Sequence, residues 1–424
     1  MRAANQEPCQ LGTALADASS VDADWTCPFC SLLCDGLALE GGADALLLNG
    51  SDCPRARAAL AAHVPRLAAS ASVDGEEASL SDAVAAAAQR LASWRQPLFG
   101  GLGTDLAGAR ALFRLAARTG AICDHADGEA MMHGLRALQD RGQFHTTLAE
   151  IRARADLIVC VGTQAVPRYP EFFRRCGLDR PATPCARVIF FGAEPPQGLP
   201  GRVKVEHVAG TGDLFIDLQQ LAAFFGRAPM RAADPALASL AAALRAARYS
   251  VFVWEAGALP RHGALAIEML HRIVMALNRD TRAASFALGG SDGGASVQQV
   301  FTWLSGLPLR TRGGVDHQPV RFAAERLLAD GAVDGLLWTW SFSPERLPPA
   351  GAWPRIVLGP AAMGARLHGG GCVFLPVATP GLDGAGHLFR TDGVVVPLAA
   401  ARDPVCPSVE RVAADLLAAL GAPA

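Results

Sequence analysis

The chain has 424 residues, of which 51% are hydrophobic and 18% charged, and its formal net charge is −2 at pH 7. A chain of this length is expected to form two or three domains rather than one compact core. The nearly balanced charge argues against nucleic acid and anionic membrane as partners, and no apolar run is long enough to span a membrane.

The N-terminal residues 1–24 are polar and rich in alanine. They predict a loose extension without an export signal. The chain contains eleven cysteines. Together these features indicate a cytoplasmic protein, because cysteines in a reducing compartment serve as metal ligands or core residues rather than as disulfides. Cys160 lies within an apolar run and is predicted to be a core residue.

Residues 25–75 contain a dense group of four cysteines. Cys27, Cys30 and Cys34 follow a C-x2-C-x3-C spacing, and Cys53 comes from a separate turn. Four thiolates can hold a tetrahedral metal ion or an iron–sulfur cluster. The x3 step and the long gap before the last cysteine favour a [4Fe–4S] cluster. Three alternatives stay open: a zinc site, free cysteines packed in a core, and a vestigial motif that once bound a cluster.

After the cysteines, helical patterns alternate with short apolar runs. Helices are expected at residues 81–94, 105–119, 133–141, 148–154, 213–225, 235–248 and 264–278. Strands are expected at residues 97–101, 156–162, 187–192, 204–208, 249–254, 333–340, 355–358 and 373–376. This alternation predicts an α/β fold with parallel sheets. The glycine-rich residues 289–294 mark the clearest break, and we expect one discontinuous α/β domain at 76–125 and 295–424 and a second at 126–294.

Two polar stretches allow a functional and a plain structural interpretation. The Gly-Thr-Gly-Asp turn at residues 210–213 can hold a phosphate at a helix N-terminus, or it can simply cap the helix. His125, flanked by Asp124 and Asp127, suggests acid–base chemistry. With no nucleophile beside them, a solvated turn is the favoured interpretation of these three residues. Trp303, Trp338, Trp340 and Trp353 are expected in the core or in a subunit interface rather than in a cofactor stack.

Several stretches, taken in order, resemble the molybdopterin oxidoreductases of the formate dehydrogenase type, and most of all the B subunit of formylmethanofuran dehydrogenase. They are Cys27–Cys34 with Cys53, and residues 138–142, 146–151, 154–163, 167–170, 294–306, 374–381 and 386–393. The resemblance covers nearly all of the chain after residue 25. It implies a molybdopterin-oxidoreductase-like fold with a small N-terminal iron–sulfur segment. The family's C-terminal dinucleotide-binding barrel has no counterpart in this sequence.

The sequence departs from the family where the metal–pterin cofactor binds. In the family a cysteine or selenocysteine followed by His-Gly coordinates tungsten or molybdenum, whereas this chain has Met132 before His133 and Gly134. A neutral thioether is too weak a donor for a high-valent metal. The nucleotide-holding stretches also differ, at residues 162–165 and 190–194. We therefore expect no tungsten or molybdenum pterin, and His133 is either a remnant of the catalytic histidine or a locally hydrogen-bonded one.

The chain is also similar to the B subunit of the bacterial formyltransferase/hydrolase complexes. That similarity implies a redox-inactive scaffold in tetrahydromethanopterin-linked oxidation of formaldehyde to formate. The implied partners are an amidohydrolase-like A subunit, a C subunit and a formyltransferase-like D subunit. The alternative functions are an active formylmethanofuran dehydrogenase subunit that interconverts CO2 and formyl-methanofuran, and a stand-alone metal-binding module. With Lys204 as its only lysine, the chain is not expected to hold the carboxylated-lysine centre of the hydrolase itself.

Overall fold

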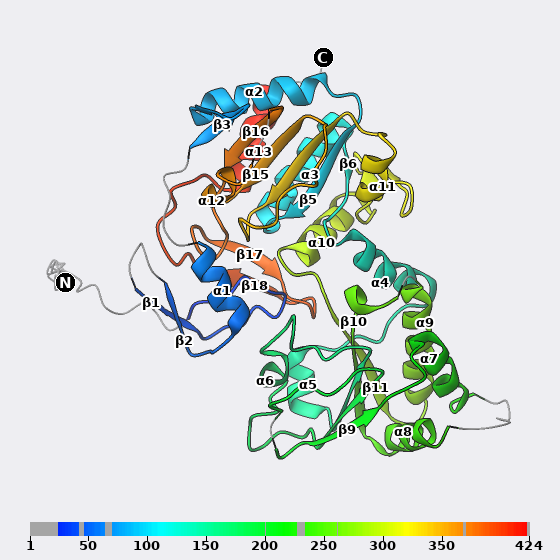
Figure 1. Cartoon of the computed structure of the whole chain (residues 1–424). Helices are drawn as coiled ribbons and strands as arrows, with labels where there is room; N and C mark the ends of the chain where they lie inside the picture. The colour runs from blue at the N-terminus through cyan, green and yellow to red at the C-terminus, as the bar shows by residue number, and fades with distance from the viewer. Residues whose placement is uncertain are drawn as a thin grey trace, which may run out of the picture.

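The computed structural model describes residues 24–41, 46–63, 70–199, 201–226, 234–260, 262–367 and 370–421. The N-terminal extension expected at residues 1–24 lies, except for its last residue, outside the described residues. Within the described parts the fold is α/β, with one large sheet that has a parallel centre and one smaller sheet that is entirely parallel. Figure 1 shows them at opposite ends of the molecule, with the N-terminal helix α1 near their junction.

The larger sheet has the strand order β13-β12-β6-β5-β14-β15-β16-β3-β4. Its parallel centre consists of β6 (Ile122–Cys123), β5 (Pro97–Gly103), β14 (Gly335–Trp340), β15 (Arg355–Gly359) and β16 (Cys372–Pro376). Antiparallel pairs extend both edges: β12 (Thr311–Arg312) with β13 (Asp316–His317), and β3 (Ala71–Val73) with β4 (Glu76–Ala78).

Helices cover the faces of this sheet because their apolar sides are buried on it. The helices α2 (Leu80–Ser93), α3 (Leu106–Thr119), α10 (Gly294–Ser305) and α13 (Val409–Ala419) share one core with the strands. The short helices α11 (Ala324–Ala329) and α12 (Ala361–Gly364) contribute Leu327 and Met363 to the core of the opposite face. The helix α2 begins at Leu80 with Ser79 as its cap, one residue before the start that the sequence predicted.

The smaller sheet is entirely parallel, with the order β11-β10-β7-β8-β9. Its strands are β7 (Leu157–Val161), β8 (Arg187–Phe191), β9 (Lys204–Val208), β10 (Tyr249–Glu255) and β11 (Arg282–Leu288). Its helices are α4 (Gly128–Arg141), α5 (Leu148–Arg154), α6 (Phe172–Arg175), α7 (Leu214–Ala223), α8 (Pro235–Ala246) and α9 (Gly263–Leu277), with the 3-10 turn η1 (Ala256–Ala258). The helix α4 starts five residues before the sequence pattern suggested.

The cysteine segment packs against one face of the smaller sheet. It contains β1 (Ala38–Glu40), β2 (Leu47–Asn49) and α1 (Pro54–Ala62). Side chains alternate between the faces of a strand, so Ile158 and Cys160 of β7 join the core of the cysteine segment, while Val159 joins the core on the other face. Cys160 is completely buried, which confirms its predicted place in the core. The remaining elements are the strands β17 (Gly386–Phe389) and β18 (Val395–Leu398), which form a hairpin. No helix in the described part of the chain has the length and apolarity that a membrane crossing needs.

Candidate functional site

Both sheets have a point where the strand order reverses. In the parallel centre of the larger sheet it lies between β5 and β14, and in the smaller sheet between β7 and β10. Connections leave such neighbouring strands in opposite directions, which opens a crevice at their carboxyl ends. Ligands of open α/β sheets bind in such crevices.

A cavity lies at each of these points, and the two cavities adjoin. The smaller, of about 430 Å³, is lined by residues that follow β14 and β6 and by α1. The larger, of about 900 Å³, is lined by residues that follow β7, β10 and β11 and by α4. Four lining residues are common to both: Arg55, Asp127, Asp292 and Arg346. The carboxyl ends of the two sheets therefore face one cleft.

Ion pairs between separate segments cross this cleft. Arg346 contacts Asp127 at 3.1 Å, and Arg55 contacts Asp292 at 3.5 Å. Burial raises the pKa of Asp292 to about 6, although the nearby Arg55 acts in the opposite direction. No sequence pattern singled out Arg55, Asp292 or Arg346, and Asp127 was considered only together with His125. Asp292 lies in the glycine-rich break. Its place as a polar residue in a loop between two expected domains could have marked it as a candidate binding residue.

His133 lines the larger cavity from α4. It is 7% exposed, and burial lowers the pKa of its imidazole below the usual value. The neighbouring Met132 is 2% exposed and is not among the lining residues, whereas Met131 and Ala130 are. None of the described residues that line either cavity is a cysteine. The cavity wall thus offers no thiolate for a metal beside His133.

The turns that would hold a nucleotide on the smaller sheet are covered by Leu214. A Cβ atom built on Gly162, directly after β7, would lie 2.7 Å from Leu214 Cδ2, and one on Gly192, after β8, would lie 3.2 Å from Cδ1. The Thr211 amide and hydroxyl donate to Asp217 at 2.9 and 2.7 Å. The loop at residues 210–213 is therefore a helix cap and not a phosphate cradle.

The four predicted ligands Cys27, Cys30, Cys34 and Cys53 are all buried and all free of disulfides. A tight loop positions the first three: the Cys27 amide donates to Cys34 O at 2.9 Å, and the Leu33 amide donates to Cys30 O at 3.1 Å. Burial raises the pKa of Cys27 well above its usual value, and the three other thiols raise it further. Burial also raises the pKa of Cys30 to about 11 and that of Cys34 to about 12.

Among the described residues, no group of three or more His, Cys, Asp or Glu could hold one metal ion. A [4Fe–4S] cluster needs a wider arrangement, because each thiolate binds a different iron. Backbone N–H groups of Phe29 and Leu32 donate to the sulfurs of Cys27 and Cys30, which is a feature that tunes such clusters. The four cysteines supply the type of donor that a [4Fe–4S] cluster binds. The presence of a cluster stays a prediction.

The expectation of a solvated turn at Asp124 and His125 was wrong. Both residues are 2% exposed. The Asp124 carboxylate pairs with the buried Arg310 at 3.3 Å and accepts from the Ala324 amide at 2.8 Å. The two residues belong to a buried polar cluster at the end of β6, where a carboxylate and an arginine compensate each other. Of the four tryptophans, Trp338 and Trp340 are buried, whereas Trp303 is 58% exposed.

Comparison with known proteins shows similarity both in sequence and in structure. No family model matches the chain. It is 31% identical over 355 residues to the B subunit of the formyltransferase/hydrolase complex Fhc of Methylorubrum extorquens, which covers 81% of this chain and 95% of that relative. Its structure matches a chain of the crystal structure of the FhcABCD formyltransferase/hydrolase complex from Methylorubrum extorquens in complex with methylofuran. That match has a TM-score of 0.71 and 29% identity, and it covers 82% of this chain and 98% of the other.

Proposed function

Because the chain belongs to the family of B subunits of formyltransferase/hydrolase complexes, we propose that it is such a subunit and serves its complex as a redox-inactive scaffold. Its partners are an amidohydrolase-like A subunit, a C subunit and a formyltransferase-like D subunit. The complex works in the cytoplasm in tetrahydromethanopterin-linked oxidation of formaldehyde to formate, with a methylofuran-type amine as the formyl carrier. Support for the assembly comes from the likeness over 95% of the relative's length.

One observation carries the scaffold role: the cavity wall at His133 lacks a thiolate. Met132 is buried away from the cavity, and Met131 and Ala130 line it instead. A thioether and a methyl group supply no negative charge to a high-valent metal. Leu214 also covers the turns after β7 and β8, which supports the loss of the nucleotide part of the cofactor. The scaffold keeps the molybdopterin-oxidoreductase-like architecture without its redox centre.

Affinity purification of the full chain from its natural host tests this proposal. Mass spectrometry is expected to find formyltransferase-like and amidohydrolase-like chains at fixed ratios to the tagged chain. Elemental analysis of the same preparation is expected to give far less than one tungsten or molybdenum per chain. A value near one would overturn the scaffold role in favour of an active formylmethanofuran dehydrogenase subunit. Recovery of the chain without partners would instead favour a stand-alone module.

We further propose that Cys27, Cys30, Cys34 and Cys53 hold a [4Fe–4S] cluster that fixes the N-terminal segment on the smaller sheet. Cluster binding would supply a cross-link between the loop at residues 27–34 and the start of α1. The support is the burial of all four thiols, their mutual effect on pKa, and the N–H donors directed at two of the sulfurs. In this role the cluster passes no electrons to a pterin-bound metal.

Replacement of Cys30 by serine is the sharpest test of the cluster. Under anaerobic purification the unchanged protein is expected to contain about four iron atoms per chain and to show a charge-transfer absorption band. Cys30→Ser should lose most of both, because serine is a poor iron ligand. Cys406→Ser, at a partly exposed cysteine outside the group, should keep them. Unchanged iron in Cys30→Ser, or one zinc per chain, would contradict the assignment.

A further inference from the structure

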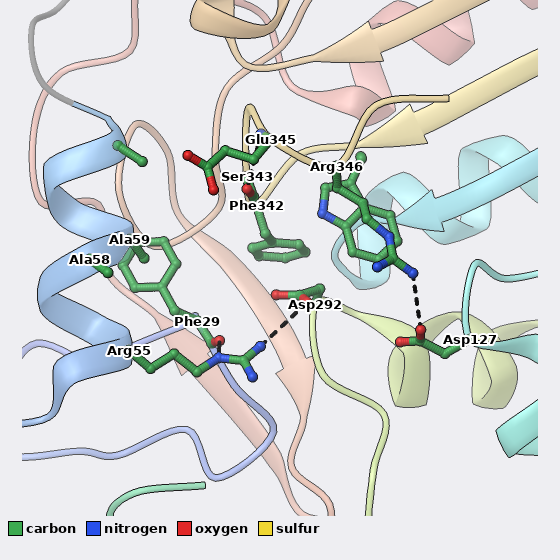
Figure 2. Close-up of a pocket in the computed structure, with 12 residues that line it drawn as sticks. Phe29, Arg55, Ala58, Ala59, Asp127, Asp292, Phe342, Ser343, Glu345 and Arg346 are labelled. Carbon is green, nitrogen blue, oxygen red and sulfur yellow. Dashed lines mark hydrogen bonds and ion pairs between the residues drawn. The ribbon is translucent and has the colours of Figure 1, made fainter. Parts of the chain in front are cut away.

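The smaller cavity has a polar side and an apolar side. Phe29, Phe342 and three alanines of α1, Ala58, Ala59 and Ala62, form the apolar side. The polar side consists of two arginines, three carboxylates and one hydroxyl: Arg55, Arg346, Asp127, Asp292, Glu345 and Ser343, with Trp340 in the wall beside them. Figure 2 shows the rings of Phe29 and Phe342 between α1 and the Arg346 side chain. A cavity of this kind suits a ligand with a compact apolar body and one polar end.

Arg346 is held in place by two tryptophans. The Trp338 indole donates to the Arg346 carbonyl at 3.1 Å, which anchors the backbone. The guanidinium lies over the Trp340 ring, 5.2 Å from its centroid, in a cation–π arrangement. Among the described residues the guanidinium makes one hydrogen bond, to Asp127 at 3.1 Å. An arginine side chain has five N–H donors in a planar fork, so most of its donors stay available for a planar oxyanion.

The wall of the cavity also contains an unpaired donor. Trp340 is 2% exposed, and its indole N–H has no hydrogen-bond partner among the described residues. Buried polar groups almost always have a partner, so an orphan of this kind indicates a missing acceptor. The His125 ring packs against the same indole, with the ring centroids 5.6 Å apart. This contact fixes the orientation of the Trp340 indole. An indole N–H can only donate, and its natural partner is an oxygen acceptor.

Arg55 adds a second positive charge on the same polar side. Its Nε donates to Phe29 O at 2.6 Å, and its contact with Asp292 is long, at 3.5 Å. By contrast, Arg390 elsewhere in the molecule donates twice to Asp392, at 2.7 and 2.8 Å. The Arg55 Nη1 also donates to Arg168 O at 3.3 Å. The cavity arginines are thus anchored by backbone and aromatic contacts, and each has one carboxylate partner, Asp127 for Arg346 and Asp292 for Arg55. This is the arrangement that leaves guanidinium groups able to bind a carboxylate or phosphate.

From these contacts we propose that the smaller cavity binds an organic oxyanion, with its carboxylate or phosphate group held by Arg346, Arg55 and the Trp340 indole, and its apolar body between Phe29, Phe342 and α1. This binding site goes beyond the scaffold role, which assigns no ligand to the chain. It needs no metal and no group-transfer step. The shared chemistry is a planar or tetrahedral oxyanion on a compact apolar group.

Titration calorimetry on the full chain, in the assembly with which it purifies, tests the site. The probes are benzoate, phenyl phosphate and the uncharged benzyl alcohol. We expect saturable binding of benzoate, phenyl phosphate or both, and at least tenfold weaker binding of benzyl alcohol. A preference for benzoate identifies a carboxylate ligand, and a preference for phenyl phosphate identifies a phosphate. No saturable binding of either anion, or equal binding of the alcohol, would overturn the proposal.

Two matched pairs of variants locate the binding. Arg346→Gln should raise the dissociation constant at least tenfold, whereas Arg326→Gln, at a similarly exposed arginine of α11, should leave it unchanged. Ala58→Glu places a negative charge at the cavity wall from an exposed position on α1, and it should weaken binding of the anions. Ala61→Glu, exposed on the same helix and outside the lining, should have no effect. If Arg346→Gln and Arg326→Gln, or Ala58→Glu and Ala61→Glu, changed the dissociation constant equally, the anion would bind outside the smaller cavity.

The outcome is separable from the test of the scaffold role. Co-purification and metal content decide the scaffold role, and neither depends on a ligand in the smaller cavity. Binding of the probes depends on the cavity residues alone. A chain that assembles normally but binds no anion would overturn the oxyanion site and leave the scaffold role standing.

Discussion

Single side chains decide which chemistry this cleft can perform. Met132, directly before His133, is 2% exposed and lies outside the cavity wall. His133 remains in the cavity wall, but burial lowers its pKa, so it is a neutral imidazole near pH 7. Asp124 was expected in a solvated turn, but it is buried beside Arg310. Burial raises the pKa of Asp124 to about 6, because desolvation outweighs the attraction of Arg310.

Asp124→Asn is expected to change both the stability and its pH dependence. The folded-state pKa of Asp124 lies above its unfolded value of 3.8, so its protonation stabilises the fold below about pH 4, and this contribution is lost as the pH rises through about 6. Asparagine cannot titrate, so the variant should lack this decline. It should also be less stable by about 1–3 kcal/mol, because Arg310 loses its buried carboxylate partner and keeps only the more exposed Glu129.

Urea unfolding at a series of pH values between 4 and 7 measures both effects. Asp330→Asn, at an exposed residue paired with Arg326, serves as the control and should change the free energy of unfolding little. A pH profile of Asp124→Asn that matches that of the unchanged protein would show that Asp124 does not titrate in this range.

At the scale of elements, α10 links the two sheets. It follows β11 of the smaller sheet through the glycine-rich break and packs on the larger sheet through Val297, Val300 and Phe301. Glycine is required at its start. Gly293 has φ +84°, and a Cβ atom there would lie 1.9 Å from the Thr104 carbonyl oxygen. The close approach of the backbone segments at Gly293 and Thr104, and not the positive φ alone, therefore requires glycine at position 293.

The two ends of α10 offer a matched comparison. Gly306, at the C-terminal end, has φ +75° and nothing within 4 Å of a built Cβ. Gly306→Ala should therefore cost only the left-handed backbone penalty, about 1 kcal/mol. Gly293→Ala must also displace the Thr104 backbone, and it should lower the free energy of unfolding at least twice as much. Chemical denaturation of both variants decides the point, and equal losses would show that the contact with Thr104 is readily relaxed.

At the scale of the whole molecule, the turn of the β17–β18 hairpin joins the cysteine segment to the smaller sheet. The Thr391 amide donates to Ser31 O of the cysteine segment at 2.9 Å, and its hydroxyl donates to Ala287 O of the smaller sheet at 2.6 Å. Asp392 accepts from the Leu148 amide, at the start of α5, at 2.9 Å. Burial alone would raise the pKa of Asp392, but hydrogen bonds from Arg390 and Leu148 lower it below the usual value.

Asp392→Asn should loosen this junction. Because the folded-state pKa of Asp392 is lowered, its stabilising contribution is present above about pH 4 and is lost as the pH falls below that value. The variant should lose about 3 kcal/mol at pH 7, since Arg390 keeps its buried position without its partner, and the difference should shrink near pH 3. Hydrogen exchange at residues 146–150 should quicken. Asp415→Asn, at an exposed ion pair of α13, should do neither, and unchanged exchange in Asp392→Asn would contradict the proposed junction.

The sequence alone determined the α/β class, about half of the helices and strands, the core position of Cys160 and the family resemblance, because these depend on local periodicity and on short motifs. It did not predict β11, α10 or α13. Boundaries were less accurate, as at α4, where the first turn is not apolar enough to be recognised. The hairpin β17–β18 was not predicted, because its short strands have no clear alternation of apolar and polar residues. Only the tertiary structure decided that residues far apart in the sequence, such as Phe29, Arg55, Asp127, Asp292 and Arg346, surround one cleft. Such a site depends on how the two sheets pack against each other, and no local sequence pattern predicts that packing.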